Sequence, residues 1–391
     1  MTSDSKNNVT LGVLVVTSIH KDFDARIWRH CTSISERGCA VGLIAPWEKS
    51  AELNVSGVDL ISFTRVNGRF SRLFLVPLRI LPRVLVNMHR YQIVHFHDID
   101  LLPWMALVSF FKPVVYDVHE NYPEEMLTRE WVPNRLRVFL FWFVKILQWL
   151  LASFIRNIVI CVPSQIRHFR GKRFRRCVLR NYSSQKIASS STVFVSNEFK
   201  TKTVKVVFSG GHYESNGSLL LLEIAKLVRK RNNTVQFIVI DRFADRDFKQ
   251  LFFATRDQFG LKNNVLIEPP VPAPLITELL AKGDIAIAPN LRILKQELAI
   301  PTKLFEYMAV GLPIVSSDLP YPKKLLNRCH CGILAQPEEP ESFADAICEL
   351  AGNSDLRRRY GQVGRQGFLD HYTWESQVPR LLQFYDEIVS G

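Results

Sequence analysis

Short apolar runs that alternate with helical patterns are the feature of this chain that most restricts its fold. The pattern occurs twice: a helix is predicted from about Asp24 to near Gly38 between the first two runs, and the alternation restarts in the second half. Apolar runs of this length, separated by helices, are typical of the buried strands of a parallel sheet built from βαβ units. The predicted strands are 11–18, 40–45, 93–97, 114–118 and 158–162, and then 205–209, 236–240, 265–268, 285–288, 313–316 and 332–334.

A chain of 391 residues is too long for one compact core and fits two domains of ordinary size. The stretch 184–203 carries Ser and Lys with weak periodicity, which predicts a linker. We therefore expect domains at 1–183 and 204–370, followed by a terminal segment, 371–391. The predicted class is α/β, with two Rossmann-like, doubly wound parallel sheets that face a cleft, and such sheets bind ligands at the carboxyl ends of their strands.

The composition, 47% hydrophobic and 22% charged, is that of a globular protein, but the net charge of +13 indicates an anionic partner. Seven scattered cysteines and a polar N-terminus without a signal-peptide pattern favour reduced thiols and a cytoplasmic protein. The one-residue spacing of Cys329-His330-Cys331 lacks the separation of zinc knuckles, and no second pair follows. No metal is expected.

Neither a dinucleotide fingerprint nor a P-loop is present. The nearest pattern is the turn 209–217, SGGHYESNG, which follows a predicted strand and precedes a predicted helix over 218–229. Gly210 and Gly211 would let the backbone approach a phosphate, and the helix N-terminus would offer N–H groups to it. Many turns carry glycine for geometry alone, so this signal is weak by itself.

The segment 301–313, PTKLFEYMAVGLP, is more specific. Pro301 can begin a helix, Lys303 and Glu306 lie one turn apart, and Gly311 with Pro313 ends the helix before a strand. This segment resembles the "EYMA-x-G-x-P" motif of the family-4 (group 1) retaining glycosyltransferases of the bacterial surface-polysaccharide type. The resemblance continues in DARI (24–27), HFHD (95–98), YDVHE (116–120), VLRN (178–181) and DHYTWE (370–375).

The resemblance implies the GT-B fold, in which the first domain binds the acceptor, the second binds the nucleotide-sugar donor, and a terminal helix over 371–391 crosses back onto the first domain. It assigns His119 as the acceptor-side catalytic residue, with His97 as its competitor. Asp98, Asp117 and Glu120 are candidates to orient either imidazole. The predicted acceptor-side residues are His97, Asp98, Asp24 and Arg26.

On the donor side, the resemblance implies that Glu306 contacts the ribose, because a carboxylate accepts two hydroxyl hydrogen bonds at once. Two departures stand out: Leu298 replaces the usual second glutamate, with Glu297 one residue away, and Gly211 and Asn216 replace the usual loop cations. Lys303, the N–H groups of the turn or His212 would have to substitute for those charges. The predicted donor-binding residues are Gly210, Gly211, His212, Asn216, Lys303 and Glu306, and Glu306 is also predicted, with His119, as a catalytic residue.

The implied reaction is transfer, with retention, of a sugar from a UDP- or GDP-sugar to a lipid-linked or polysaccharide acceptor, without a cofactor. The departing phosphate accepts the proton of the acceptor, so no protein nucleophile is needed. Two alternatives remain: an epimerase of the same fold, and a catalytically impaired relative that acts as a partner or scaffold.

The charge excess is concentrated in the first half. Residues 131–180 contain eleven Lys or Arg and no acid, and within them 138–155 is aromatic and apolar; 70–90 is similar, although Pro77 and Pro82 are expected to interrupt any long helix there. A membrane span is disfavoured because 138–155 joins two strands of one sheet. A core helix with solvated arginines competes with binding at an anionic membrane surface, and we favour the surface, at the inner face of the cell membrane.

The basic run 167–176 interleaves cations with Phe169 and Phe174, as nucleic-acid binding would require. No recognisable nucleic-acid module surrounds it, so no nucleic-acid partner is expected.

Overall fold

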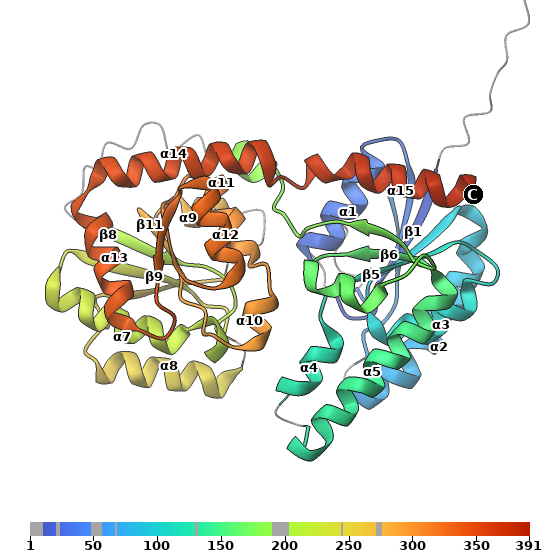
Figure 1. Cartoon of the computed structure of the whole chain (residues 1–391), viewed down its shortest axis with the longest axis horizontal. Coiled ribbons are helices and arrows are strands. Elements are labelled where there is room, and N and C mark those ends of the chain that lie inside the picture. The colour runs from blue at the N-terminus through green and yellow to red at the C-terminus, as the bar shows by residue number, and fades with distance from the viewer. Residues whose placement is uncertain are drawn as a thin grey trace, which may run out of the picture. The chain divides into compact units, whose positions relative to one another are not determined.

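The computed structural model describes residues 11–20, 24–47, 57–66, 69–129, 132–189, 203–243, 245–270 and 276–391. These residues form two compact units, 1–180 with 377–391 and 181–376, called here the first and second unit (Figure 1). The N-terminal decapeptide and most of the predicted linker 184–203 lie outside the described residues.

The first unit is built on a seven-stranded parallel sheet with strand order β3-β2-β1-β4-β5-β6-β7. Figure 1 shows α1 and α15 on one face of this sheet and α2, α3 and α5 on the other. The elements are β1 Gly12–Val16, α1 Ala25–Ser35, β2 Ala40–Ala45, β3 Val58–Ser62, α2 Arg69–Asn87, β4 Ile93–Phe96, α3 Leu102–Val108, β5 Val114–Val118, α4 Tyr122–Thr128, α5 Asn134–Ile155, β6 Asn157–Ile160, β7 Arg175–Val178 and α15 Val378–Ser390.

The second unit carries a six-stranded parallel sheet, order β10-β9-β8-β11-β12-β13. Its central strands are buried on both faces: Val206 and Phe208 pack into one core and Val207 into another. The elements are α6 Lys186–Ser189, β8 Val204–Phe208, α7 Ser218–Arg231, β9 Val235–Ile240, α8 Arg246–Gln258, β10 Val265–Glu268, α9 Ile276–Leu280, β11 Ile285–Ala288, α10 Leu294–Leu298, α11 Thr302–Ala309, β12 Ile314–Ser317, α12 Pro320–Cys329, β13 Gly332–Ala335, α13 Pro340–Gly352 and α14 Ser354–His371.

Strand order reverses direction at one point in each sheet, between β1 and β4 and between β8 and β11. Chain connections diverge to opposite faces there, which leaves a crevice at the carboxyl ends of the two strands. The loops after β1 and β4 carry the histidines and carboxylates of the first unit, and the loop after β8 carries the glycine turn.

The predicted α/β class with two doubly wound sheets is confirmed, but details differ. Two edge strands, β3 and β7, were missed because their exposed residues break the apolar pattern. The prediction that prolines interrupt the 70–90 segment was wrong: α2 continues through Pro77 and Pro82. Its buried face, Val76, Ile80 and Val84 at four-residue spacing, packs into the core, and this burial offsets the hydrogen bonds that the prolines remove.

The C-terminal helix α15 belongs to the first unit, and the second unit continues to residue 376. Arg175 of β7 donates a hydrogen bond from Nη1 to the Glu387 carbonyl at 3.0 Å, which ties α15 to the sheet edge. The helix thereby brings Tyr385 into the polar cluster described next.

Candidate functional site

Asp98 joins the loops that follow β1 and β4. Its Oδ2 accepts hydrogen bonds from Thr17 Oγ1 at 2.7 Å and from the Ser18 N–H at 2.6 Å, and its Oδ1 lies 3.3 Å from His20 Nε2. The carboxylate is buried. Asp98 therefore fixes the two loops together, and the contacts it makes are with these residues rather than with the imidazoles it was predicted to orient.

Asp24 caps helix α1. Its Oδ1 accepts from the N–H groups of Arg26 at 3.0 Å and Ile27 at 3.3 Å, which satisfies two N–H groups that a helix start leaves open. Its Oδ2 pairs with His20 Nδ1 at 2.8 Å. Burial opposes the charged form of His20, but the hydrogen bonds and charges of Asp24 and Asp98 outweigh it and raise the pKa of His20 to about 10. The sequence patterns did not indicate this histidine, although it stands four residues before Asp24, where the helix was predicted to start.

Arg26 forms a buried ion pair with Asp117 at the end of β5. Its Nη2 donates to both carboxylate oxygens, at 2.7 and 2.9 Å, and both residues are buried. Burial opposes ionisation of Asp117, but the adjacent charge of Arg26 outweighs it and holds the pKa of that carboxyl well below its usual range. Arg26 was predicted as an acceptor-side contact; it is instead buried, where it neutralises the carboxylate of Asp117.

His97 and His119 form a stacked, hydrogen-bonded pair. His97 Nδ1 lies 2.7 Å from His119 Nε2, the ring centroids are 4.8 Å apart, and Asp117 Oδ2 lies 3.4 Å from His97 Nδ1. Burial and then the charge of Arg26 lower the pKa of His119 to about 4, so the imidazole is neutral at pH 7. His97 is fully buried, whereas His119 keeps partial exposure, so of the two competing candidates only His119 is open to a ligand.

Three further residues complete this cluster: His30, His95 and Tyr385. The Tyr385 hydroxyl lies 2.7 Å from both His30 Nε2 and His95 Nδ1. The sequence held a local signal for the two histidines, since His30 follows Arg26 by one helical turn and His95 shares a strand face with His97. No local signal could have indicated Tyr385, which is 290 residues from His95 along the chain.

In the second unit, the turn after β8 requires glycine at two positions with positive φ. Gly210 has φ +107° and open space where a side chain would lie. Gly217 has φ +75°, and a Cβ there would lie 1.8 Å from the Pro289 carbonyl oxygen. The backbone at Gly210 is therefore uncovered, as an approach to a phosphate requires, while Gly217 sets the close packing of the turn on the loop after β11.

Two of the predicted donor contacts, His212 and Asn216, are used within the protein. His212 is fully buried and its ring nitrogens bond Ser218 Oγ at 3.1 Å and the Ile240 carbonyl at 2.6 Å. Asn216 donates to the Gly211 carbonyl at 2.7 Å and accepts from Gln296 at 2.9 Å. The prediction that the His212 side chain substitutes for a loop cation is therefore wrong, because it has neither exposure nor a free nitrogen; both residues shape the turn.

Lys303 lies near this turn, against Phe208 at the end of β8. Its Nζ is buried, makes no hydrogen bond among the described residues, and lies 4.6 Å from the centroid of the Phe208 ring. Burial, partly offset by the charge of Glu306, lowers the pKa of Lys303 to about 7. Glu306 follows on the same helix and keeps partial exposure.

Helix α11, which carries Lys303 and Glu306, is held against the glycine turn by Tyr307. Its hydroxyl accepts from the Ser209 N–H at 3.0 Å and lies 3.2 Å from the Ile287 carbonyl. Leu298 and Glu297, which stand at and beside the position of the missing glutamate, end helix α10 and are partly exposed.

Comparisons with known proteins agree with this architecture. Residues 24–175 match the model of Glycosyltransferase Family 4, and residues 203–353 match that of Glycosyl transferases group 1. The Glycosyltransferase Family 4 model covers the histidine cluster apart from Tyr385. The Glycosyl transferases group 1 model covers the glycine turn and α11.

Among curated relatives, D-inositol 3-phosphate glycosyltransferase of Paenarthrobacter aurescens is 23% identical over 48% of this chain and 44% of its own length. Phosphatidyl-myo-inositol mannosyltransferase of Mycobacterium leprae is 26% identical over 48% of each chain. The chain thus spans about half the length of these relatives. The crystal structure of Anabaena Alr3699/HepE in complex with UDP-glucose superposes with a TM-score of 0.72 over 97% of this chain and 100% of that chain at 16% identity, which shows the fold. With both halves matched by the family models, the chain belongs to the family-4 (group 1) glycosyltransferases of the GT-B fold.

Proposed function

We propose that this protein transfers a sugar, with retention of configuration, from a UDP- or GDP-sugar to a lipid-linked or polysaccharide acceptor. The observation that carries the proposal is Lys303, a buried ammonium without a hydrogen-bond partner beside the glycine turn. An unpaired buried cation is costly in the free protein unless a ligand supplies the opposite charge. The diphosphate of a nucleotide-sugar would supply that charge.

The donor subsite proposed here combines three features of the second unit. The open backbone at Gly210 receives a phosphate, Lys303 offsets its charge, and Glu306 accepts hydroxyl hydrogen bonds from the ribose. Lys303 thereby supplies the positive charge that the loop lacks, because Gly211 and Asn216 stand in place of the usual loop cations. The UDP-glucose complex of the HepE structure supports a nucleotide-sugar as the ligand of this fold.

In the proposed reaction, a hydroxyl oxygen of the acceptor bonds to the anomeric carbon on the face from which the phosphate departs. The bond from that carbon to the phosphate oxygen breaks, and the hydroxyl proton passes to the departing phosphate, so atoms and charge balance without a protein nucleophile. His119, neutral and partly exposed, donates a hydrogen bond from Nδ1 to an oxygen of the sugar or of the acceptor. We propose that the transfer itself requires no metal or organic cofactor.

A thermal-shift panel of UDP-, GDP- and ADP-sugars tests the donor assignment. One nucleotide class is expected to raise the Tm of the wild type, and the shift should vanish in Glu306→Ala while an exposed control, Glu339→Ala, retains it. Equal shifts in wild type and Glu306→Ala would refute the site. Product formed from the donor alone would support the epimerase, and binding without turnover in the presence of candidate acceptors would support the scaffold.

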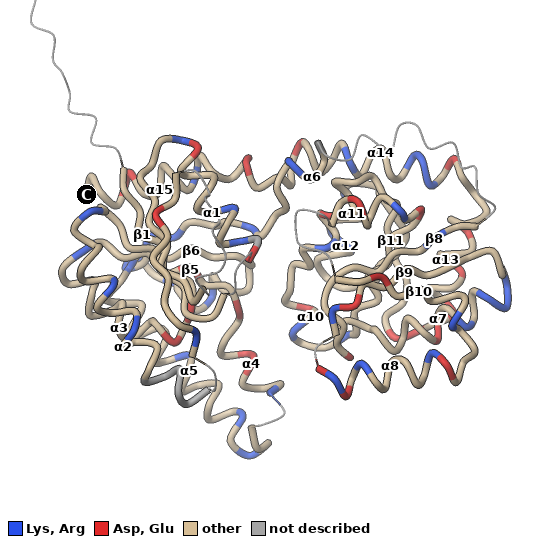
Figure 2. The backbone as a smooth tube through the Cα atoms, turned by 180° about the vertical axis from the view of Figure 1, so that it is seen from behind, with Lys and Arg blue, Asp and Glu red and all other residues tan. Residues whose placement is uncertain are grey.

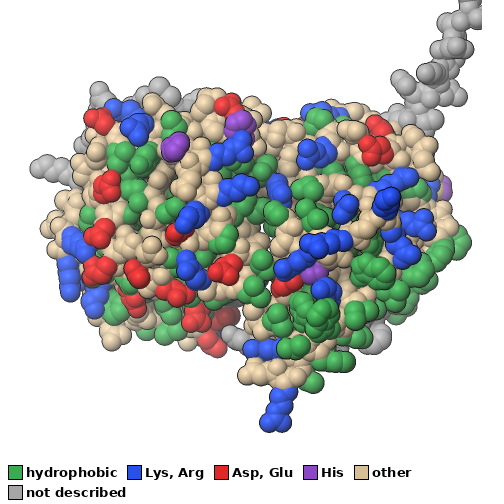
Figure 3. All heavy atoms as spheres, in the orientation of Figure 1, with side chains coloured by type: hydrophobic (Ala, Val, Ile, Leu, Met, Phe, Trp, Pro, Cys, Tyr) green, Lys and Arg blue, Asp and Glu red, His purple; other side chains and the backbone are tan. Residues whose placement is uncertain are grey.

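We further propose that the first unit binds an anionic membrane surface through helix α5, at the inner face of the cell membrane. Large apolar side chains of α5 are half or more exposed, including Val138 at 61%, Phe139 at 64% and Ile146 at 60%. Figure 3 shows hydrophobic side chains gathered over this region, and Figure 2 shows acidic positions on α4 but none along α5. Leu78 on α2, at 70%, and Phe111 after α3, at 76%, extend the same kind of surface.

Helix α5 is the one helix of the described residues that is long and apolar enough to cross a bilayer. Crossing would separate β5 from β6, which pair directly in the sheet, so an arrangement along the surface fits the fold better. Lys145, which lies 4.4 Å over the Trp142 ring, gives α5 a cation for anionic headgroups.

Sedimentation with anionic and with neutral liposomes tests the membrane proposal. The wild type should enter the anionic pellet, and the double change Phe139→Ser with Ile146→Ser should abolish this; Leu251→Ser, an exposed apolar position in the second unit, is the matched control. Absence of the wild type from both pellets would refute the proposal.

A further inference from the structure

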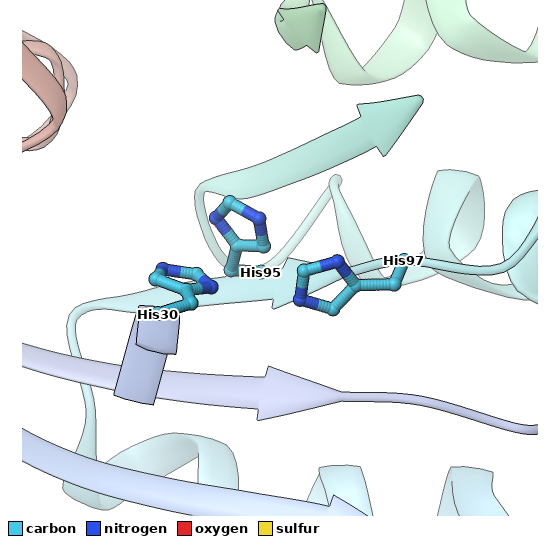
Figure 4. Close-up of side chains that lie close together, drawn as sticks. All are labelled: His30, His95 and His97. Atoms are coloured by element: carbon cyan, nitrogen blue, oxygen red, sulfur yellow. The ribbon is translucent and has the colours of Figure 1, made fainter. Parts of the chain in front are cut away.

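Three histidine rings meet inside the first unit, next to the partly exposed His119. His30 comes from α1, and His95 and His97 come from the end of β4 (Figure 4). The ring centroids are 4.3 Å apart for His30 and His95, 4.9 Å for His95 and His97, and 5.6 Å for His30 and His97. All three side chains are buried, with at most 2% exposure.

The hydrogen bonds of this cluster leave two ring nitrogens without a partner among the described residues. His30 Nδ1 and His97 Nε2 are buried and have no partner among the described residues. The opposite nitrogens, His30 Nε2 and His97 Nδ1, are engaged at 2.7 Å by Tyr385 and His119. When those engaged nitrogens carry the protons, His30 Nδ1 and His97 Nε2 each have a free lone pair, which is the form of a histidine nitrogen that binds a metal.

We propose that His30, His95 and His97 form a zinc site. One nitrogen from each ring can be chosen so that all three lie within 4.8 Å of one another. Zinc–nitrogen bonds of about 2.0–2.1 Å place tetrahedral ligands roughly 3.4 Å apart, so small ring rotations suffice. An all-imidazole ligand set suits Zn²⁺ and disfavours Mg²⁺ or Ca²⁺, which prefer oxygen.

His95 would have to release one contact to join this set. It has a short hydrogen bond to Tyr385 at 2.7 Å and a longer contact, 3.4 Å, between Nε2 and Asp117 Oδ2. The longer contact is the weaker one and the one that a metal would replace. The proton of His95 would then lie on Nδ1, and the Tyr385 oxygen would accept hydrogen bonds from His30 Nε2–H and His95 Nδ1–H, as the hydrogen-bond partners of metal-bound histidines commonly do.

A second set of possible ligands, His97 with Asp117 and His119, is less suited. Both oxygens of Asp117 are held by Arg26, and His97 Nδ1 is bonded to His119 Nε2. A metal there would have to break the buried ion pair, which is costly. At the three-histidine set, Asp117 stays paired with Arg26 and remains close enough to offset part of the metal charge.

Zinc at this position would fix the tautomer of the reactive histidine. With the metal on His97 Nε2, the proton of His97 resides on Nδ1 and is donated to His119 Nε2, which leaves the proton of His119 on its other nitrogen. The same ion would join α1 to β4 and, through Tyr385, to α15. The zinc is thus a structural element beside the transfer site and independent of donor binding.

Zinc affinity of the full chain tests this assignment without any sugar substrate. Stripped wild type is titrated with Zn²⁺ against a chromophoric chelator, and one Zn²⁺ per chain with a Kd below about 1 μM is expected. His30→Gln and His97→Gln should each weaken binding at least 100-fold. His89→Gln, which changes an exposed histidine of the same unit, should leave it unchanged.

A second measurement uses only the wild type, in case a buried histidine variant does not fold. Co²⁺ should give the visible absorption of a tetrahedral nitrogen site at one equivalent, and Zn²⁺ should raise the Tm of the stripped protein. Wild type that binds no Zn²⁺ below 100 μM, or binding that both His30→Gln and His97→Gln retain in folded form, would overturn the proposal. The rings would then be a neutral hydrogen-bonded cluster.

Discussion

The two units hold the charged groups near the ends of their strands in opposite ways. In the first unit, Asp117 is paired with Arg26, and Asp98 is held by two hydrogen-bond donors and His20. In the second unit, the Lys303 ammonium is buried without a hydrogen-bond partner in the described part of the chain. A charge that the protein itself neutralises is fixed before any ligand arrives, whereas a buried cation without a hydrogen-bond partner gains stabilisation only from a ligand. Substitutions of these charged groups should therefore affect folding in the first unit and donor binding in the second.

The largest effect is expected for Asp117→Asn. It leaves the guanidinium of Arg26 buried without a counter-charge, which should lower the free energy of unfolding by about 3–5 kcal/mol. Urea denaturation of the purified variant measures this. Asp59→Asn, which breaks an exposed ion pair with Arg90, is the matched control and should cost less than about 1 kcal/mol. A loss at Asp117 as small as at Asp59 would show that Asp117 does not neutralise a buried charge.

Lys303→Met should have the opposite signature. Methionine fills a similar volume without charge, so the free protein should be no less stable than the wild type, while the Kd for the nucleotide-sugar should rise about 10- to 100-fold. Isothermal titration together with urea denaturation separates the two quantities. Lys324→Met on the exposed surface of α12 should change neither. Unchanged donor affinity would remove Lys303 from the donor subsite.

Features that depend on neighbouring residues could be predicted from the sequence in both units. The two sheets, the start of α1 at Asp24 and helix α11 were predicted from local patterns: apolar runs, helical periodicity and a Pro-to-Gly helix segment. Each of these patterns spans only a few neighbouring residues, so a single sequence is enough to predict the element.

Long-range packing determined what the sequence did not predict. Tyr385 reaches His30 from 355 residues away, and Arg26 is directed to Asp117 by the packing of α1 on the sheet. The continuity of α2 through Pro77 and Pro82 depends on burial of its apolar face, which proline rules alone do not include. His212 looked available because a sequence shows a residue type and not its hydrogen-bond partners.

The pKa of Lys303 should make donor binding depend on pH. Burial lowers that pKa to about 7, and a bound diphosphate should raise it, so donor binding takes up a proton above pH 7. The Kd for the donor should therefore increase as pH rises from 7 to 9, by at most about tenfold per pH unit. Titrations at several pH values measure this slope. In Lys303→Met the slope should disappear, and a slope that persists there would assign the proton to another group.

The smallest effect is expected at His20, a partly exposed member of the charged network of the first unit. Its folded pKa of about 10 lies above the usual value of 6.5, because the Asp24 and Asp98 carboxylates overcome burial. A raised pKa means that its stabilisation is complete below pH 6.5 and is lost as pH rises through 10. His20→Gln should thus lower the unfolding free energy by about 1 kcal/mol at pH 6, with the deficit shrinking toward pH 10. Both carboxylates stay ionised throughout that window, so a deficit that is constant with pH would mean that His20 contributes as a neutral hydrogen-bond partner and not as a charge.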